Sequence, residues 1–106
     1  MTSQQISDRL FAFIRQEVPP PLPASLTLAT DLRKDLRMAE EDADELLGKL
    51  FQAFDIQPGD FAFTRYFPSE GLWPFGRKRA APVPLTLGML LKAASVGVWN
   101  TAAVEN

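Results

Sequence analysis

Apolar residues recur at helical spacing in three parts of the chain, and these parts predict its main elements. The first part runs to Val18 and places its apolar side chains at Ile6, Leu10, Phe13, Ile14 and Val18. This spacing predicts an amphipathic helix, which Thr2 or Ser3 can cap at its start. The helix must end near Val18 because three consecutive prolines follow, and proline removes the backbone donor that a helix needs.

The strongest helical pattern covers residues 40 to 54. Its apolar residues fall at positions i, i+3, i+4, i+7, i+8 and i+11, namely Ala43, Leu46, Leu47, Leu50, Phe51 and Phe54. A stripe of this kind is typical of a helix that lays one face on a hydrophobic core. We therefore expect the second helix here.

A third helix is predicted from Thr86 as N-cap, after Pro84. It should bury Leu87, Leu90, Leu91 and Ala94. Gly97 is a natural stop, after which Val98 and Trp99 would fold back on the bundle. Residues 100 to 106 should fray, as chain ends commonly do.

The segments between these helices have weaker signals. Residues 18 to 24 hold four prolines and predict a stiff extended strap, and residues 25 to 37 predict a loop fixed to the core by leucines, including Leu28. Between 55 and 68 the phenylalanines fit either a short strand or one helical turn. Residues 69 to 84 predict a long irregular loop or a hairpin, so a small two-stranded ribbon near 61–84 stays open.

Composition favours a folded chain of one domain, residues 1–106. The sequence has 106 residues, of which 46% are hydrophobic and 23% charged, as in ordinary globular proteins. The expected fold is thus mainly all-α, a helical bundle of three main helices plus a short element.

Charge and missing residue types exclude several functions. The formal net charge is −2, which gives no basic footprint for nucleic acid. The chain has no cysteine and no histidine, so it lacks thiolate nucleophiles, the usual general base and the commonest metal ligands. We therefore expect no enzyme activity, no metal and no cofactor.

The sequence also predicts where the protein works. The first residues carry no basic leader, and no apolar run approaches the roughly 20 residues that span a bilayer. We expect a cytoplasmic protein without a membrane span.

Residues 35 to 46 are similar to the signature of acyl carrier proteins, Asp-Leu-Gly-x-Asp-Ser-Leu-Asp-x-x-Glu-Leu. Five positions match: Asp35, Leu36, Asp42, Glu45 and Leu46. Further stretches resemble a bacterial family of unknown function that is described as acyl-carrier-like, namely 54–56, Phe61, 65–68, 85–90 and 97–99. The resemblance implies an acyl-carrier-type helical bundle in a bacterial protein.

The departures from the carrier signature concern the prosthetic group. Glu40 occupies the position of the serine that bears phosphopantetheine, Ala39 that of the preceding aspartate, and Arg37 that of the glycine. Since a carboxylate cannot accept the phosphodiester, the resemblance implies a relative of the carriers without the arm.

Five acidic residues gather at the predicted start of the second helix: Glu40, Glu41, Asp42, Asp44 and Glu45. Helix electrostatics alone can account for them, because each acid near a helix N-terminus gains about 0.3 to 1 kcal/mol from the macrodipole. In carriers, by resemblance, this helix docks on basic patches of partner enzymes. Glu41, Asp42 and Glu45 are therefore the first candidates for protein binding.

A second candidate surface lies in the long loop. Arg77, Lys78 and Arg79 follow Tyr66, Phe67, Trp73 and Phe75, a mixture of basic and aromatic residues found where proteins or single-stranded nucleic acids bind. The plain alternative is that the aromatics cover the bundle and the cations keep the loop soluble.

We therefore expect a non-catalytic, acyl-carrier-like protein-interaction module whose partner is a protein and which binds no nucleic acid. Two alternatives stay open. One is a genuine acyl carrier or lipid-handling protein, and the other is a single-stranded nucleic-acid binder that uses the aromatic-basic loop.

Overall fold

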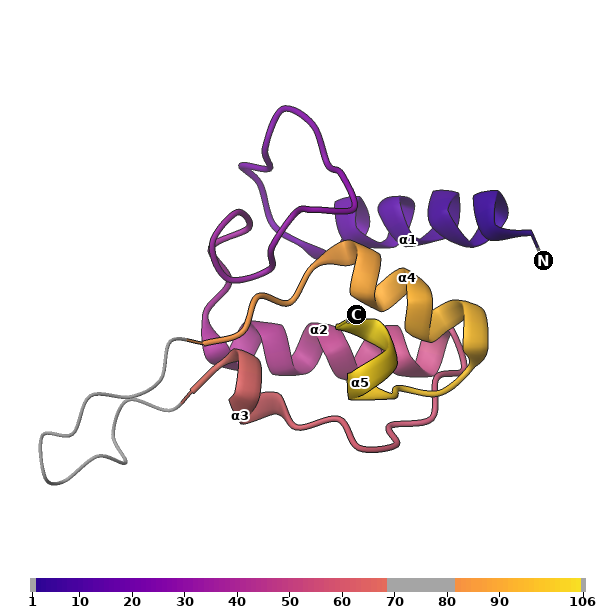
Figure 1. Ribbon diagram of the computed structural model, residues 1–106. Helices are drawn as coiled ribbons and strands as arrows, with labels where there is room; N and C mark the ends of the chain where they lie inside the picture. The colour runs from indigo at the N-terminus through magenta and orange to yellow at the C-terminus, as the bar shows by residue number, and fades with distance from the viewer. Residues whose placement is uncertain (1, 69–81, 106) are drawn as a thin grey trace, which may run out of the picture.

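The computed structural model describes residues 2–68 and 82–105. This part contains five helices: α1 (Ser3–Glu17), α2 (Glu40–Ala53), α3 (Phe63–Tyr66), α4 (Leu87–Val96) and α5 (Thr101–Val104), arranged as in Figure 1. Within the same ranges there is no strand, and the β-type pairings are two isolated bridges, Asp31 with Thr86 and Gln57 with Val98. The expectation of a mainly helical protein is confirmed. None of the described helices is long and apolar enough to cross a membrane.

Helix α1 has the predicted bounds because its first turn is closed by a capping box. The Gln5 amide donates to the Thr2 hydroxyl at 3.2 Å, and the Thr2 amide donates to the Gln5 side chain at 2.9 Å. These two bonds satisfy donors that a helix start otherwise leaves without partners. The helix buries Leu10 and Ile14 completely, and Val18 terminates it in an extended conformation.

Helix α2 lies across the molecule from α1 and buries the predicted stripe. Ala43, Leu46, Leu47 and Leu50 are buried, whereas the two phenylalanines at its end are half-buried. The Phe54 ring meets the edge of the Phe13 ring of α1 at 5.8 Å between centroids. Edge-on aromatic pairs of this kind add packing energy beyond the area they bury. This contact therefore joins α1 and α2 at one end.

Helix α4 packs against α1 and α5 and has the predicted caps, Thr86 at its start and left-handed Gly97 at its end. Its buried face is slightly rotated from the expected one. Leu87 and Leu90 are buried as predicted, but Met89 and Ala93 replace Leu91 and Ala94, which are half-buried. The expected face was wrong here because α4 is apolar on most sides, so periodicity alone does not fix its orientation.

The open choice between a strand and a helical turn is resolved in favour of the turn. Residues 63–66 form α3, and the Phe63 and Phe67 rings stack at 5.0 Å between centroids, as residues four apart in a helix do. The ribbon considered near 61–84 is absent from its described parts, 61–68 and 82–84. There, a single hydrogen bond, from the Val83 amide to the Arg65 carbonyl, joins the two segments. Residues 69–81 lie outside the described ranges.

The loop from 25 to 37 is fixed to the core as expected, but by fewer leucines and more backbone bonds. Leu32 and Leu36 are buried, whereas Leu28 is 45% exposed and so was wrongly expected to hold the loop. The Leu32 amide donates to the Leu85 carbonyl at 3.0 Å, and the Leu28 carbonyl accepts from the Gly88 amide at 2.8 Å. Leu28 therefore helps to fix the loop through its backbone carbonyl rather than its side chain. The pattern of apolar residues in a sequence does not predict such backbone bonds.

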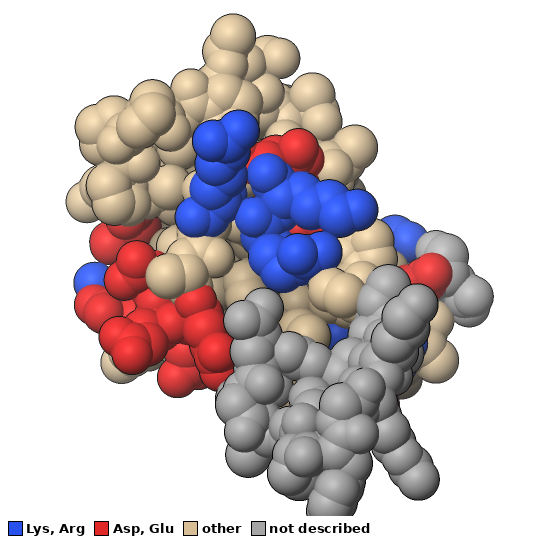
Figure 2. All heavy atoms as spheres, turned by 90° about the vertical axis from the view of Figure 1, so that its left-hand side faces the viewer, with Lys and Arg blue, Asp and Glu red and all other residues tan. Residues whose placement is uncertain are grey.

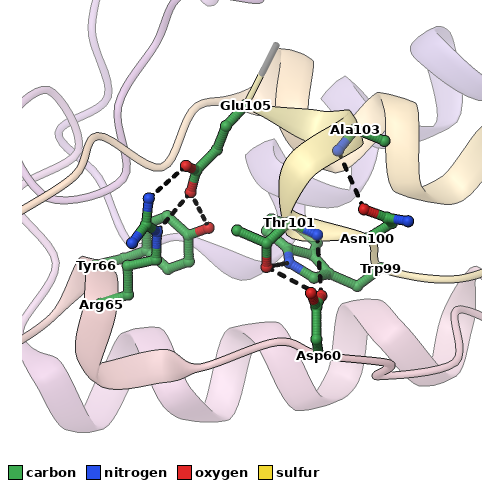
Figure 3. A network of polar contacts seen from close by, with 8 residues as sticks. All are labelled: Asp60, Arg65, Tyr66, Trp99, Asn100, Thr101, Ala103 and Glu105. Carbon is green, nitrogen blue, oxygen red and sulfur yellow. Dashed lines mark hydrogen bonds and ion pairs between the residues drawn. The ribbon is translucent and has the colours of Figure 1, made fainter.

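The expected fraying of residues 100 to 106 is wrong for residues 100–105. Asn100 caps α5 by accepting from the Ala103 amide at 3.1 Å, and Val104 is buried. Asp60 accepts from both the amide and the hydroxyl of Thr101, at 2.9 and 3.0 Å, as Figure 3 shows. The Thr101 hydroxyl in turn accepts from the buried Trp99 indole at 2.9 Å. These side-chain bonds hold a segment too short to be stable alone.

Glu105 completes this attachment by binding α3 (Figure 3). Its carboxylate accepts two hydrogen bonds from the Arg65 guanidinium, at 2.6 and 2.8 Å, and one from the Tyr66 hydroxyl at 2.5 Å. The hydrogen bonds from the Arg65 guanidinium are the main cause of a lowered pKa of Glu105; burial opposes them, and the bond from the Tyr66 hydroxyl adds to the lowering. Burial, followed by the bond to Glu105, raises the pKa of Tyr66 to about 12. The last helix is thereby tied to the middle of the chain.

Candidate functional site

The acidic start of α2 is exposed to solvent. Glu40, Glu41, Asp42, Asp44 and Glu45 all have exposed side chains, and three of them stand in the first helical turn. The N-cap residue, Ala39, offers no side-chain hydrogen bond. No side chain therefore caps the free backbone N–H groups of this turn. The nearby carboxylates instead interact favourably with the positive end of the helix dipole. We name these five residues the acidic face.

Ion pairing divides the acidic face into two parts. Lys49 lies 3.3 Å from Glu45 and 3.5 Å from Glu17, so it links the end of α1 to α2. The pKa of Lys49 is raised, first by its hydrogen bond to Glu45 and then by the charge of Glu17. The negative charge of Glu45 is thus partly balanced by the ammonium group of Lys49. Glu41 and Asp42 make no ion pair with any residue in the described part of the chain.

Figure 2 shows a group of Lys and Arg side chains beside a group of Asp and Glu side chains on one side of the molecule. The segment that leads into α2 contains Arg33, Lys34 and Arg37; Arg33 is half-buried and the other two are exposed. Sequence analysis did not treat these cations as a group, because Arg33 and Lys34 precede the carrier-like signature and Arg37 was considered only as the residue at its glycine position. Their grouping depends on the turn that precedes α2.

That turn is built by two aspartates. Asp31 is 5% exposed, and one of its carboxylate oxygens accepts from the Arg33 amide at 2.9 Å. Asp35 accepts from the Asp31 amide at 2.8 Å, and its own amide donates to the Asp31 carbonyl at 2.9 Å. Aspartate favours such local bonds because its short side chain reaches nearby backbone amides. The turn ends at Arg37, whose φ of 52° is left-handed.

A groove runs between the proline strap and the start of α2. Its central hollow, about 540 Å³, lies between residues 18–23 on one side and 35–38 with Asp42 on the other. A hollow of about 140 Å³ continues from Pro19 and Asp42 towards Glu45 and Lys49. A third, about 330 Å³, continues from Pro23 and Asp35 towards Thr30. Because neighbouring hollows share lining residues, we treat them as one feature, the strap groove.

A separate apolar hollow of about 530 Å³ lies where α4 and α5 meet the start of α1. Val96, which is 73% exposed, and Val98 line it together with Leu91. No charged group of the acidic face reaches this hollow, so it is independent of the strap groove.

Of the second predicted surface, the structure describes only Tyr66 and Phe67. Arg77, Lys78 and Arg79, with Trp73 and Phe75, lie outside the described residues. Tyr66 and Phe67 were expected to belong to it, but both are buried core residues, at 1% and 4% exposure. The Tyr66 ring stacks with the Phe61 ring, and the Phe67 ring stacks with the Phe63 ring. Their spacing as a helical turn, rather than as a strand, is what turns them inward.

Nothing in the described ranges forms a cluster of three or more acidic side chains suited to hold a metal ion. The acids of α2 are spread along an exposed helix face, so their oxygens do not converge on one point. What this arrangement offers is a charged rim beside a groove.

Comparison with known proteins places the chain in a family. Neither a search of curated proteins nor one of solved structures found a match. Residues 3–101, nearly the entire chain, match the sequence profile of the family described as "Protein of unknown function (DUF1493)". The matched range includes α1 to α4, the strap groove and the acidic face. The chain belongs to this DUF1493 family of proteins of unknown function.

Proposed function

We propose that this chain is a non-catalytic protein-interaction module of acyl-carrier type that carries no phosphopantetheine. Its docking surface is the acidic face, with Glu41, Asp42 and Glu45 as the residues that meet a bacterial cytoplasmic partner. The observation that carries the proposal is the exposure of Glu41 and Asp42 on the first turn of α2 with no cation paired to them within the described chain. Unpaired charges at a helix start favour an encounter with a basic surface.

Two features support the carrier-type geometry of this surface. Glu40, at the position of the carrier serine, is the first residue of α2. Arg37, at the position of the carrier glycine, adopts a left-handed backbone, which glycine adopts most readily. Both features support the proposal that the chain keeps the backbone form of the signature where its side chains depart from it.

The non-catalytic character rests on side-chain chemistry. The sequence has no histidine or cysteine, and the carboxylates of α2 are solvent-facing. Acid and base catalysis by paired carboxylates needs environments that drive their pKa values apart, which an exposed helix face does not supply.

A charge-reversal pair tests the docking surface. Glu41→Lys should abolish recovery of the partner when the tagged protein is captured from its native cytoplasm and its companions are quantified by mass spectrometry. Asp8→Lys, an exposed reversal on α1, is the matched control because it changes the net charge equally and should leave recovery intact. Recovery that is unchanged by Glu41→Lys, or lost equally in both variants, removes the proposed surface.

The genuine-carrier alternative is decided by intact mass. Incubation with a phosphopantetheinyl transferase and coenzyme A should leave the mass of the wild-type protein unchanged, since Glu40 offers no hydroxyl. The Ala39→Asp/Glu40→Ser variant, which restores the Asp-Ser pair, should gain the mass of one arm. An arm on any residue of the wild-type protein would establish the carrier function instead.

A further inference from the structure

The strap groove has one wall in which hydrogen-bond acceptors outnumber donors. Four prolines of the strap, Pro19, Pro20, Pro21 and Pro23, have no backbone N–H group. The backbone of residues 19–26 makes no hydrogen bond within the described chain, so its carbonyl oxygens are left to solvent or to a ligand. A molecule that lies along this wall is therefore favoured if it is rich in donors.

Carboxylates outnumber cations in the lining of the groove. Glu17, Asp35, Asp42 and Glu45 line the groove, against two cations, Arg37 and Lys49. Lys49 is already shared by Glu17 and Glu45, and one oxygen of Asp35 accepts from the Asp31 amide. Asp42, which borders both the central and the smaller hollow, has no hydrogen bond or ion pair in the described chain. Both walls thus favour a cation.

The floor of the central hollow is apolar. Val18 and Leu36 are buried beneath it, and Leu22 and Met38 are half-buried at its sides. A volume of about 540 Å³ exceeds what one small ion needs and suits a side chain with several carbon atoms. The third hollow, towards Thr30, extends the groove beyond the length of a single side chain.

We propose that the strap groove binds an extended, lysine- or arginine-rich segment of a partner protein. Its backbone and side-chain donors meet the carbonyls of the strap, its cations meet Asp42 and Asp35, and one aliphatic side chain covers Leu36 and Met38. This inference rests on the proposed function and adds the chemistry of the partner. An acidic peptide or a nucleic acid is excluded from the groove by the same carboxylates.

Arg37 acts against such a ligand. It is the one groove cation without an ion pair among the described residues, and its left-handed backbone holds it between the strap and α2. Its removal should therefore tighten binding of a cationic segment, whereas removal of Asp42 should weaken it. Opposite effects from two residues on one wall are difficult to obtain from loss of folding, and a variant with the same charge change on α1 controls for net charge.

The test measures binding of a short capped peptide, made of Lys and Ser residues with one central Leu, to the full chain. Fluorescence anisotropy gives the affinity, and amide chemical shifts of the protein locate the binding site. Shift changes are expected at Glu17, Val18, Leu22, Met38 and Asp42. Asp42→Lys should weaken binding about fivefold or more and Arg37→Glu should strengthen it by a similar factor, as loss or gain of an exposed charge pair. Asp8→Lys, the control of equal charge, should do neither.

Three results would overturn the groove assignment: no shift change in the strap residues, equal weakening by Asp42→Lys and Asp8→Lys, or equal affinity for a peptide with Ser in place of Leu. The last result would show that a polycation suffices and that the apolar floor is unused. Loss of the groove assignment together with a Glu41-dependent pull-down would leave the docking function standing. Peptide binding in the groove, together with a pull-down that Glu41→Lys does not affect, would leave the groove assignment standing and remove the docking function.

Discussion

Left-handed backbone marks the residues on which the described turns depend. It occurs at Arg37, Asp55, Gly59 and Gly97. At Gly97 a side chain would meet open space, so only the backbone conformation favours glycine. At Gly59 two requirements coincide, because φ is 54° and an added Cβ would lie 2.1 Å from the Trp99 carbonyl oxygen. Backbone carbonyls cannot move aside as a flexible side chain can. Gly59 therefore fixes the turn against the segment that carries Trp99.

We expect Gly59→Ala to lower the free energy of unfolding by at least about 2 kcal/mol, since left-handed alanine alone costs about 1 to 2. Gly48→Ala is the matched control. Gly48 is exposed within α2, and an added Cβ meets nothing within 4 Å. That substitution should stabilise by about 0.5 to 1 kcal/mol. Urea unfolding followed by circular dichroism measures both. Equal effects of the two alanines would contradict the close approach at Gly59.

At the scale of elements, the sequence predicted those helices whose stability is local. Helices α1, α2 and α4 have long apolar stripes, and α1 and α4 also have recognisable caps and stops, so the bounds of all three were predicted to within one or two residues. The missed element, α5, has four residues, and its stability comes from residues some forty positions away: Asp60 binds Thr101, and Arg65 binds Glu105. Sequence periodicity contains no such information, because it describes neighbours along the chain only.

The candidate site divides in the same way. The acidic face could be predicted because its residues lie close together in the sequence, in the first turns of one helix. The strap groove could not, since its walls belong to two segments separated by residues 24–34, and their approach depends on backbone bonds such as that from Leu32 to Leu85. The inward orientation of Tyr66 and Phe67 was missed for a related reason. It follows from whether 63–66 is helix or strand, which the phenylalanine spacing left undecided.

The bond between α5 and α3 should make stability depend on pH in the acid range. The pKa of Glu105 is lower in the folded than in the unfolded chain, so its contribution is fully present above the unfolded value, near 4.5, and is lost as pH falls through the folded value. Glu105→Gln should therefore lower the midpoint of thermal unfolding at pH 7 but approach the wild-type midpoint at lower pH. Asp8→Asn, remote from this contact, is the control. A difference that is constant with pH would mean that the Glu105 charge is not the stabilising group.

At the scale of the whole molecule, charge is segregated although the net charge is small. Figure 2 shows acidic and basic side chains grouped next to each other on one side of the molecule. The acidic face and the cations Arg33, Lys34 and Arg37 belong to adjoining segments of the chain. Two copies could in principle place the acids of one opposite the cations of the other. Whether they associate depends on how the gain from such pairs compares with the cost of bringing two molecules together.

The magnitudes favour a single copy in solution. A two-fold arrangement would form about six exposed pairs, each worth about 0.2 to 1 kcal/mol, whereas association costs about 4 to 15 kcal/mol. The free energy gained from these pairs, less the cost of association, does not reach that of a stable dimer. Salt at about 0.15 M weakens the attraction further, because it screens charges more than about 8 Å apart. We expect sedimentation equilibrium to show a monomer at this salt concentration, with weak self-association only at low salt, and Glu41→Lys to reduce it. A dimer that persists in high salt would show that apolar contacts, such as those available around Val96, join the copies instead.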